Sequence, residues 1–159
     1  MGNVAKYLPI VATVLITVIF TIMGFLPKLT GAAEPQYLFG YTFGSSDFLG
    51  LNAVWALFEP LGRYAIGATE LLVVVLLWLG VFISVGMRKI GALLGLALMA
   101  GAIFFHLTII GVATDFPLAG QTPPFGPETL VESDGGTLFG AACLSFLLFI
   151  YLFVSKPKT

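Results

Sequence analysis

Charged side chains are scarce in this sequence of 159 residues: 9% are charged, whereas 58% are hydrophobic and the mean hydropathy is +1.05. Soluble domains carry roughly a quarter charged residues. The scarcity therefore argues against a soluble domain and indicates an integral membrane protein that lies in a lipid bilayer. The net charge is −1 and no stretch clusters Lys and Arg, so we expect no nucleic-acid partner.

Cysteine and histidine occur once each, as Cys143 and His106. A single thiol cannot form an internal disulfide, a CxxC redox pair or a cysteine-ligated cluster. A single histidine excludes two-histidine haem ligation within the chain, and a catalytic metal site usually needs three protein ligands. We therefore expect no metal and no cofactor bound by this chain alone, with a quinone as the one open possibility.

Four apolar stretches approach or exceed the roughly 20 residues that a helix needs to cross a membrane. They lie at residues 8–26, 61–85, 91–112 and 138–154. We predict an all-α integral membrane fold, a four-transmembrane-helix bundle, as one domain over residues 1–159. Two long outer loops, at residues 29–60 and 113–137, connect the spans. Pro27 and Gly31 predict the end of the first span.

The short connection Met87-Arg88-Lys89 predicts a tight turn that makes the second and third spans antiparallel neighbours. One side of the predicted bundle then holds basic residues and no acid: Lys6, Arg88, Lys89, Lys156 and Lys158. The other side mixes two basic residues with seven acids: Lys28, Arg63, Glu34, Asp47, Glu59, Asp115, Glu128, Glu132 and Asp134. The positive-inside rule places both termini in the cytoplasm and both long loops outside.

The two loops differ in pattern. Aromatic residues alternate between Tyr37 and Phe43, which predicts a short strand or an aromatic belt. Apolar residues recur at helical spacing between Phe48 and Phe58, which predicts a short helix at the membrane interface. The second loop is rich in Pro and Gly and predicts an irregular cap. Ser133-Asp134-Gly135-Gly136 is a start signal for the last helix.

Glu70 lies inside the second span, where an ionisable group costs about 2.5–3.5 kcal/mol and should face the protein interior with a partner. Arg63 lies on the same helix face, two turns earlier, with Gly67 between them. On the first span Thr13, Thr17, Thr21, Gly24 and Lys28 form a polar stripe, whose hydroxyls can bond carbonyls of their own helix. His106 lies on a face of the third span.

The face that holds His106 also carries three small residues, Gly91, Gly95 and Ala102, and Met99 lies on this face between Gly95 and Ala102. Gly91-xxx-Gly95 is a seam of the kind that lets helices approach closely. Glu70 and His106 both fall in the outer half of the bundle, where a contact between them is geometrically allowed. They are the candidate catalytic pair, in a pocket that would bind or deprotonate a small polar head group.

Each of these residues also has a structural interpretation. Glu70 can be a hydrogen-bonding or ion-pairing residue that holds the bundle together. His106 can be a packing residue. Arg63 is most simply paired with Glu59, one turn earlier. Cys143 is a small apolar filler, and the loop aromatics are interface anchors.

Several motifs together resemble the bacterial DoxX-like family of small four-helix membrane proteins. They are GFLPKLTGA at residues 24–32, EPLGR at 59–63, GALLG at 91–95, GAIFFHLT at 101–108 and DGG at 134–136. The positions that match the family pattern are Lys28, Glu59, Arg63, Glu70, His106, Thr108 and Asp134. The resemblance implies the same bundle with both termini inside, in a bacterial cytoplasmic (inner) membrane. It adds Thr108 and Asp134 to the pocket or ion-pair candidates Lys28, Glu59 and Arg63.

The resemblance implies an accessory subunit of a larger membrane assembly, of a redox or respiratory type, that has other membrane-protein subunits as partners. Such a chain would not be catalytic on its own. The alternative is a stand-alone quinone-interacting oxidoreductase with an outward-facing Glu/His pocket. A transporter of small solutes or protons is the least favoured interpretation, because four short spans show no evident inverted repeat.

Overall fold

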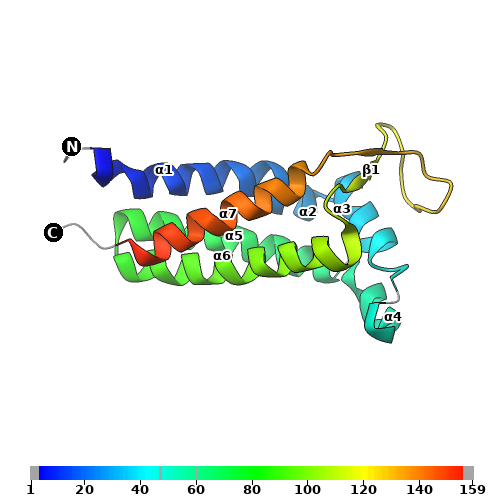
Figure 1. Cartoon of the computed structure of the whole chain (residues 1–159), viewed down its shortest axis with the longest axis horizontal. Helices are drawn as coiled ribbons and strands as arrows, with labels where there is room; N and C mark the ends of the chain where they lie inside the picture. Colours follow the sequence, from blue (N-terminus) through cyan, green and yellow to red (C-terminus); the bar gives the residue numbers. More distant parts are fainter. Residues whose placement is uncertain (1–3, 47, 60, 156–159) are drawn as a thin grey trace.

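The computed structural model describes residues 4–46, 48–59 and 61–155, and it is mostly helical. Four of its helices are long and apolar enough to cross a membrane, which confirms the four predicted spans as helices. They are Tyr7–Thr30, Leu61–Phe82, Val85–Ile110 and Thr137–Val154. The helices run side by side, and the two loop segments gather at one end of the bundle (Figure 1).

The first span is a broken helix made of α1 (Val4–Ile19), the π-helical turn η1 (Phe20–Phe25) and α2 (Leu26–Thr30). Its predicted end at Pro27 is wrong, because Pro27 lies in the first turn of α2, where a missing N–H costs nothing. The break falls earlier, at Gly24, whose backbone is non-helical (φ −104°, ψ −109°). Gly31 then ends α2 in the left-handed region (φ 74°).

α5 (Leu61–Phe82) and α6 (Val85–Phe105) pack against each other as the predicted neighbours. The turn between them is not where Met87-Arg88-Lys89 predicted it, because those residues already belong to the first turn of α6. Ser84 starts α6 instead: its Oγ accepts a hydrogen bond from the Met87 N–H at 3.3 Å. A Cβ at Gly80 would lie 2.3 Å from the Cβ of Arg88, so glycine permits this close approach.

α7 (Thr137–Val154) packs on α6 and α1, and α1 in turn packs on α5, which closes the bundle. The core between the helices includes Ile16, Phe20, Leu77 and Phe149, all nearly inaccessible to solvent. The start of α1 and the end of α7 lie at the same end of the bundle, opposite the loops (Figure 1).

Arg88 and Lys89, at the start of α6, lie at that same end. Of the other charges on which the predicted orientation rests, Lys156, Lys158 and Asp47 lie outside the described residues.

The first loop folds into short helical pieces rather than a strand. They are α3 (Ala33–Gln36), the π-helical turn η2 (Tyr37–Thr42), η3 (Phe48–Gly50), α4 (Asn52–Trp55) and η4 (Ala56–Phe58). The predicted helix is thus present in parts, whereas the alternating aromatics form a helical turn. Their rings turn inward and stack: the Phe43 and Phe58 centroids lie 5.0 Å apart, and Phe105 meets Phe43 edge-on at 5.1 Å.

The third span continues beyond α6 as the π-helical turn η5 (His106–Ile110). The second loop then forms a small antiparallel pair, β1 (Asp115–Pro117) with β2 (Val131–Ser133), in which Phe116 faces Glu132. Only residues 118–130 between the two strands fit the predicted irregular cap.

The predicted small-residue seam serves two neighbours rather than one. A Cβ at Gly91 would lie 2.9 Å from the Cβ of Leu76 on α5. A Cβ at Gly95 would lie 2.3 Å from the ring of Phe149 on α7. That ring is itself held edge-on against Phe20, with 5.6 Å between centroids. α6 can therefore pack closely on both flanking helices.

We expect Gly95→Ala to lower the free energy of unfolding by about 1–3 kcal/mol, since the new methyl overlaps a fixed ring in a filled core. Thermal unfolding in detergent measures this change. Gly101→Ala on the same helix is the matched control, because no atom lies within 4 Å of its added Cβ. Equal stability of the two variants would contradict this packing.

Candidate functional site

Glu70 forms an ion pair with Lys28 inside the bundle, with both carboxylate oxygens 3.0 Å from the Lys28 Nζ. Glu70 is 4% exposed on α5, and Lys28 reaches it from α2. Glycine permits both approaches. A Cβ at Gly24 would lie 3.1 Å from Glu70 Oε2, and a Cβ at Gly67 would lie 3.1 Å from the Lys28 Cβ. The buried carboxylate thus has the partner that its position requires, from another helix.

Arg63 is not the partner of Glu70, although the two lie on one face of α5. Its guanidinium binds Glu59 through two hydrogen bonds, from Nε at 2.5 Å and from Nη2 at 2.9 Å. This confirms the pair that the spacing of four residues predicted. Arg63 Nη1 also donates to the backbone carbonyl of Lys28. Arg63 therefore ties α2 to α5 directly beside the Lys28–Glu70 pair.

His106, 3% exposed, is held by the second loop. Its Nδ1 lies 2.8 Å from the carbonyl oxygen of Gly111 and 3.5 Å from the Thr114 hydroxyl. A carbonyl oxygen can only accept, so Nδ1 carries the hydrogen. In the neutral ring the lone pair then lies on Nε2, and no group in the described part of the chain bonds to that nitrogen.

Asp134 joins the second loop to α7. Its Oδ1 accepts from the backbone N–H groups of Thr114 at 2.7 Å and Gly136 at 2.8 Å, and its Oδ2 accepts from that of Leu138 at 2.8 Å. Burial alone would raise the pKa of Asp134, but these three hydrogen bonds outweigh burial and hold the pKa below its usual value. The predicted start signal is confirmed, and it also fixes Thr114 beside His106.

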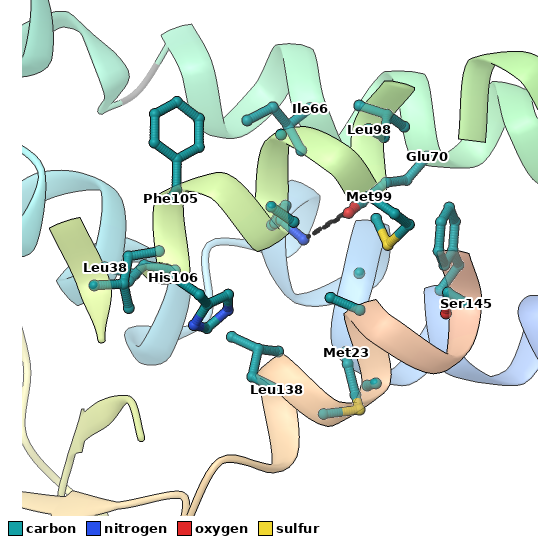
Figure 2. Close-up of a pocket in the computed structure, with 18 of the residues that line it drawn as sticks. Met23, Leu38, Ile66, Glu70, Leu98, Met99, Phe105, His106, Leu138 and Ser145 are labelled. Carbon is teal, nitrogen blue, oxygen red and sulfur yellow. Dashed lines mark hydrogen bonds and ion pairs between the residues drawn. The ribbon is translucent and has the colours of Figure 1, made fainter. Parts of the chain in front are cut away.

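A cavity of about 230 Å³ opens among η1, α5, α6 and α7 at the loop end of the bundle. Its lining includes five aromatic rings, from Phe20, Phe39, Phe43, Phe58 and Phe105, and five small residues, Ala97, Gly101, Ala102, Ala141 and Ala142. Four polar or charged residues also line it: Lys28, Glu70, His106 and Ser145. Figure 2 shows His106 between Leu38 and Leu138, with Ser145 at the opposite end of the group.

Ser145 is fully buried on α7, and its hydroxyl has no hydrogen-bond partner among the residues that the structure describes. A buried hydroxyl without a partner costs free energy, so such a group calls for an explanation. Ser145 also lines the cavity, and a turn of its side chain to another rotamer would let a bound molecule supply the missing bond. Sequence reasoning missed this role, because a serine in an apolar helix carries no local signal of what it faces.

The structure thus separates the candidate residues into four groups. Glu70, His106, Lys28 and Ala102 line the cavity, although Glu70 and His106 bond to different partners rather than to each other. Glu59, Arg63 and Asp134 support it from outside. Gly67, Gly91 and Gly95 serve helix packing, and Thr108 is exposed, with its hydroxyl bonded to the Phe104 carbonyl.

Comparisons of the chain with protein-family models, curated proteins and solved structures found no match. The DoxX-like resemblance therefore stays a prediction from the sequence. Among the described residues, no three His, Cys, Asp or Glu side chains gather where they could hold a metal ion.

Removal of one partner of the buried ion pair should cost more than removal of both. We expect Lys28→Met to lower the free energy of unfolding by about 3 kcal/mol, because it leaves the Glu70 carboxylate without a countercharge. The double variant Lys28→Met/Glu70→Met should recover a large part of that loss. Thermal unfolding in detergent measures both, and the exposed Lys89→Met is the matched control. A double variant less stable than Lys28→Met would contradict the pairing.

Loss of the Asp134 carboxylate should destabilise the protein in a pH-dependent way. Because folding lowers the pKa of Asp134, its contribution is fully present above the pKa of the unfolded side chain, about 3.9, and disappears as the pH falls through the lower folded value. We expect Asp134→Asn to cost about 1–2 kcal/mol near pH 7 and progressively less below pH 4. Thermal midpoints across this range test it, with the exposed Glu132→Gln as control. If the stability lost in Asp134→Asn did not change with pH, the negative charge of Asp134 would not contribute to stability.

Proposed function

We propose that this protein binds a small amphipathic molecule of the quinone class within the loop end of its helical bundle. The observation that carries this proposal is the cavity of about 230 Å³, whose walls are aromatic and aliphatic and which has few polar groups. Such composition is typical of sites for small organic molecules. A planar apolar ring with oxygen substituents suits these walls and the two unpaired polar atoms, His106 Nε2 and Ser145 Oγ.

The Lys28–Glu70 pair has a supporting role in this proposal. Each charge already has its countercharge, so the pair can remain buried next to an apolar ligand at a tolerable cost. A neutral ring system is therefore a better occupant than an anion or a cation, which would have to compete with one member of the pair. This argument also disfavours the transport of charged solutes.

The setting that we propose is a bacterial inner membrane, with the loop end on the outer side. The charge distribution supports this orientation, because Arg88 and Lys89 lie at the end opposite the loops and basic residues favour the cytoplasmic side. The cavity would then lie in the outer half of the bilayer, where a membrane-dissolved molecule can reach it.

We propose further that the protein works as an accessory subunit of a redox assembly, as the resemblance implies. The second loop supports this role, since residues 118–130 extend beyond the bundle (Figure 1). The exposed acids Asp115, Glu128 and Glu132 lie in the same region of the chain. A projecting acidic loop is suited to contact a basic surface of a companion chain.

Mild detergent extraction followed by intact-complex mass spectrometry tests both roles. We expect the native protein to retain a quinone-type molecule, and Ala142→Leu to reduce its occupancy at least fivefold because the larger side chain fills the cavity. Ala100→Leu, exposed on α6, is the matched control. Companion chains would support the accessory role. A wild-type protein without any bound molecule, which also takes up none when quinone is added, would overturn the binding proposal.

A further inference from the structure

The hydrogen on Nδ1 of His106 restricts what the cavity can bind. Gly111 supplies a carbonyl oxygen at 2.8 Å, which fixes the donor at Nδ1 and leaves the neutral ring with an acceptor at Nε2. Imidazole has one ring carbon between its two nitrogens, so Nε2 points away from the Gly111 carbonyl that Nδ1 meets. His106 lines the cavity, which is where a partner for Nε2 can lie, since no described residue bonds to that nitrogen. The ligand atom that meets Nε2 must therefore carry a hydrogen.

The tautomer is held by more than one contact. The hydroxyl of Thr114, which is 1% exposed, lies 3.5 Å from Nδ1, and Asp134 fixes the Thr114 backbone by accepting from its N–H at 2.7 Å. The ring of Phe139 packs edge-on against the imidazole, with 5.6 Å between centroids. A ring turned by 180° would lose the bond to Gly111 and place a carbon against that carbonyl. The loop therefore presents Nε2 as a fixed acceptor.

The other polar residues of the cavity do not discriminate between a ligand hydroxyl and a ligand oxygen that only accepts. The Ser145 hydroxyl rotates and can donate or accept, so it pairs with either kind of oxygen. Glu70 and Lys28 are engaged with each other. The choice between a hydroxyl and a carbonyl or ether oxygen thus rests on His106.

We propose that the cavity selects head groups that bear a hydroxyl, of the phenol or quinol type, over the matching forms whose oxygens only accept. This inference rests on the proposed function and names the form of the ligand that the site prefers. In the preferred complex the ligand hydroxyl donates to His106 Nε2, and Ser145 bonds the opposite part of the head group when an oxygen is present there. A ligand oxygen that only accepts would meet the lone pair of His106 Nε2. Neither atom would then have a hydrogen bond, which is costly in a buried site.

Two chemically stable probe molecules that share one ring system test this selection. We would titrate the protein in lipid nanodiscs at pH 8 with 2-naphthol and with 2-methoxynaphthalene by calorimetry, with empty nanodiscs as the blank. We expect the naphthol to bind about tenfold more tightly, which is the typical value of one net hydrogen bond.

Two variants assign the preference to a specific atom. His106→Phe keeps an aromatic ring but removes the acceptor, so the preference should fall below about twofold. Thr108→Val is the matched control, because Thr108 is exposed on η5 and its hydroxyl bonds the Phe104 carbonyl, and it should retain the preference. An unchanged preference in a folded His106→Phe protein would overturn the proposal.

A measurement on the wild-type chain keeps the test independent of variant folding. The sequence has one histidine, so ¹⁵N NMR of labelled protein reports on His106 without ambiguity. We expect the Nδ1–H tautomer, and a shift of the Nε2 resonance on addition of naphthol but not of its methyl ether. The opposite tautomer, or equal affinity for the two probes, overturns the inference and leaves ligand binding intact. Failure of both probes to bind overturns the proposed function, and this inference with it.

Discussion

The ion pair between Lys28 and Glu70 is the constraint on which the loop end of the bundle depends. A carboxylate in a membrane helix requires a countercharge, and this one comes from a different helix. The first span can supply it because its π-helical turn breaks at Gly24 and brings α2 against α5. Arg63 strengthens the contact between α2 and α5, since it donates to the backbone carbonyl of Lys28 while it pairs with Glu59.

The cavity is a consequence of that arrangement and of the side chains around it. Alanine and glycine on α6 and α7 are too small to fill the space beside the ion pair, and the loop aromatics cover it from the end. Phe43, 2% exposed, stacks on Phe58 and meets Phe105 of α6, so the loop is packed onto the bundle as part of the fold. The prediction that these aromatics anchor the protein at the interface overlooked this packing, which a sequence pattern of alternating rings does not reveal.

The features that could be predicted are those that depend on neighbours in the chain. Hydrophobic length indicated the four helices, and a spacing of four residues indicated the Glu59–Arg63 pair. The hydroxyls of Thr17 and Thr21 bond carbonyls of their own helix as expected, whereas that of Thr13 has no partner among the described residues. The partner of Glu70 could not be predicted in this way. Side chains on a helix tilt toward its N-terminus, so Arg63 turns toward Glu59 and away from Glu70.

By itself the sequence determined the class of protein, the four helices and the presence of a buried carboxylate and a single histidine, because these follow from composition and local periodicity. The tertiary structure decided that Lys28 neutralises Glu70, that the second loop fixes the tautomer of His106, and that Ser145 borders a cavity without a bond. The ion pair and the cavity depend on which residues from distant parts of the chain meet, whereas the tautomer depends on how the chain turns after η5 to bring the Gly111 carbonyl to Nδ1. That meeting is set by the break at Gly24 and by the packing of the loops, which local sequence patterns do not encode.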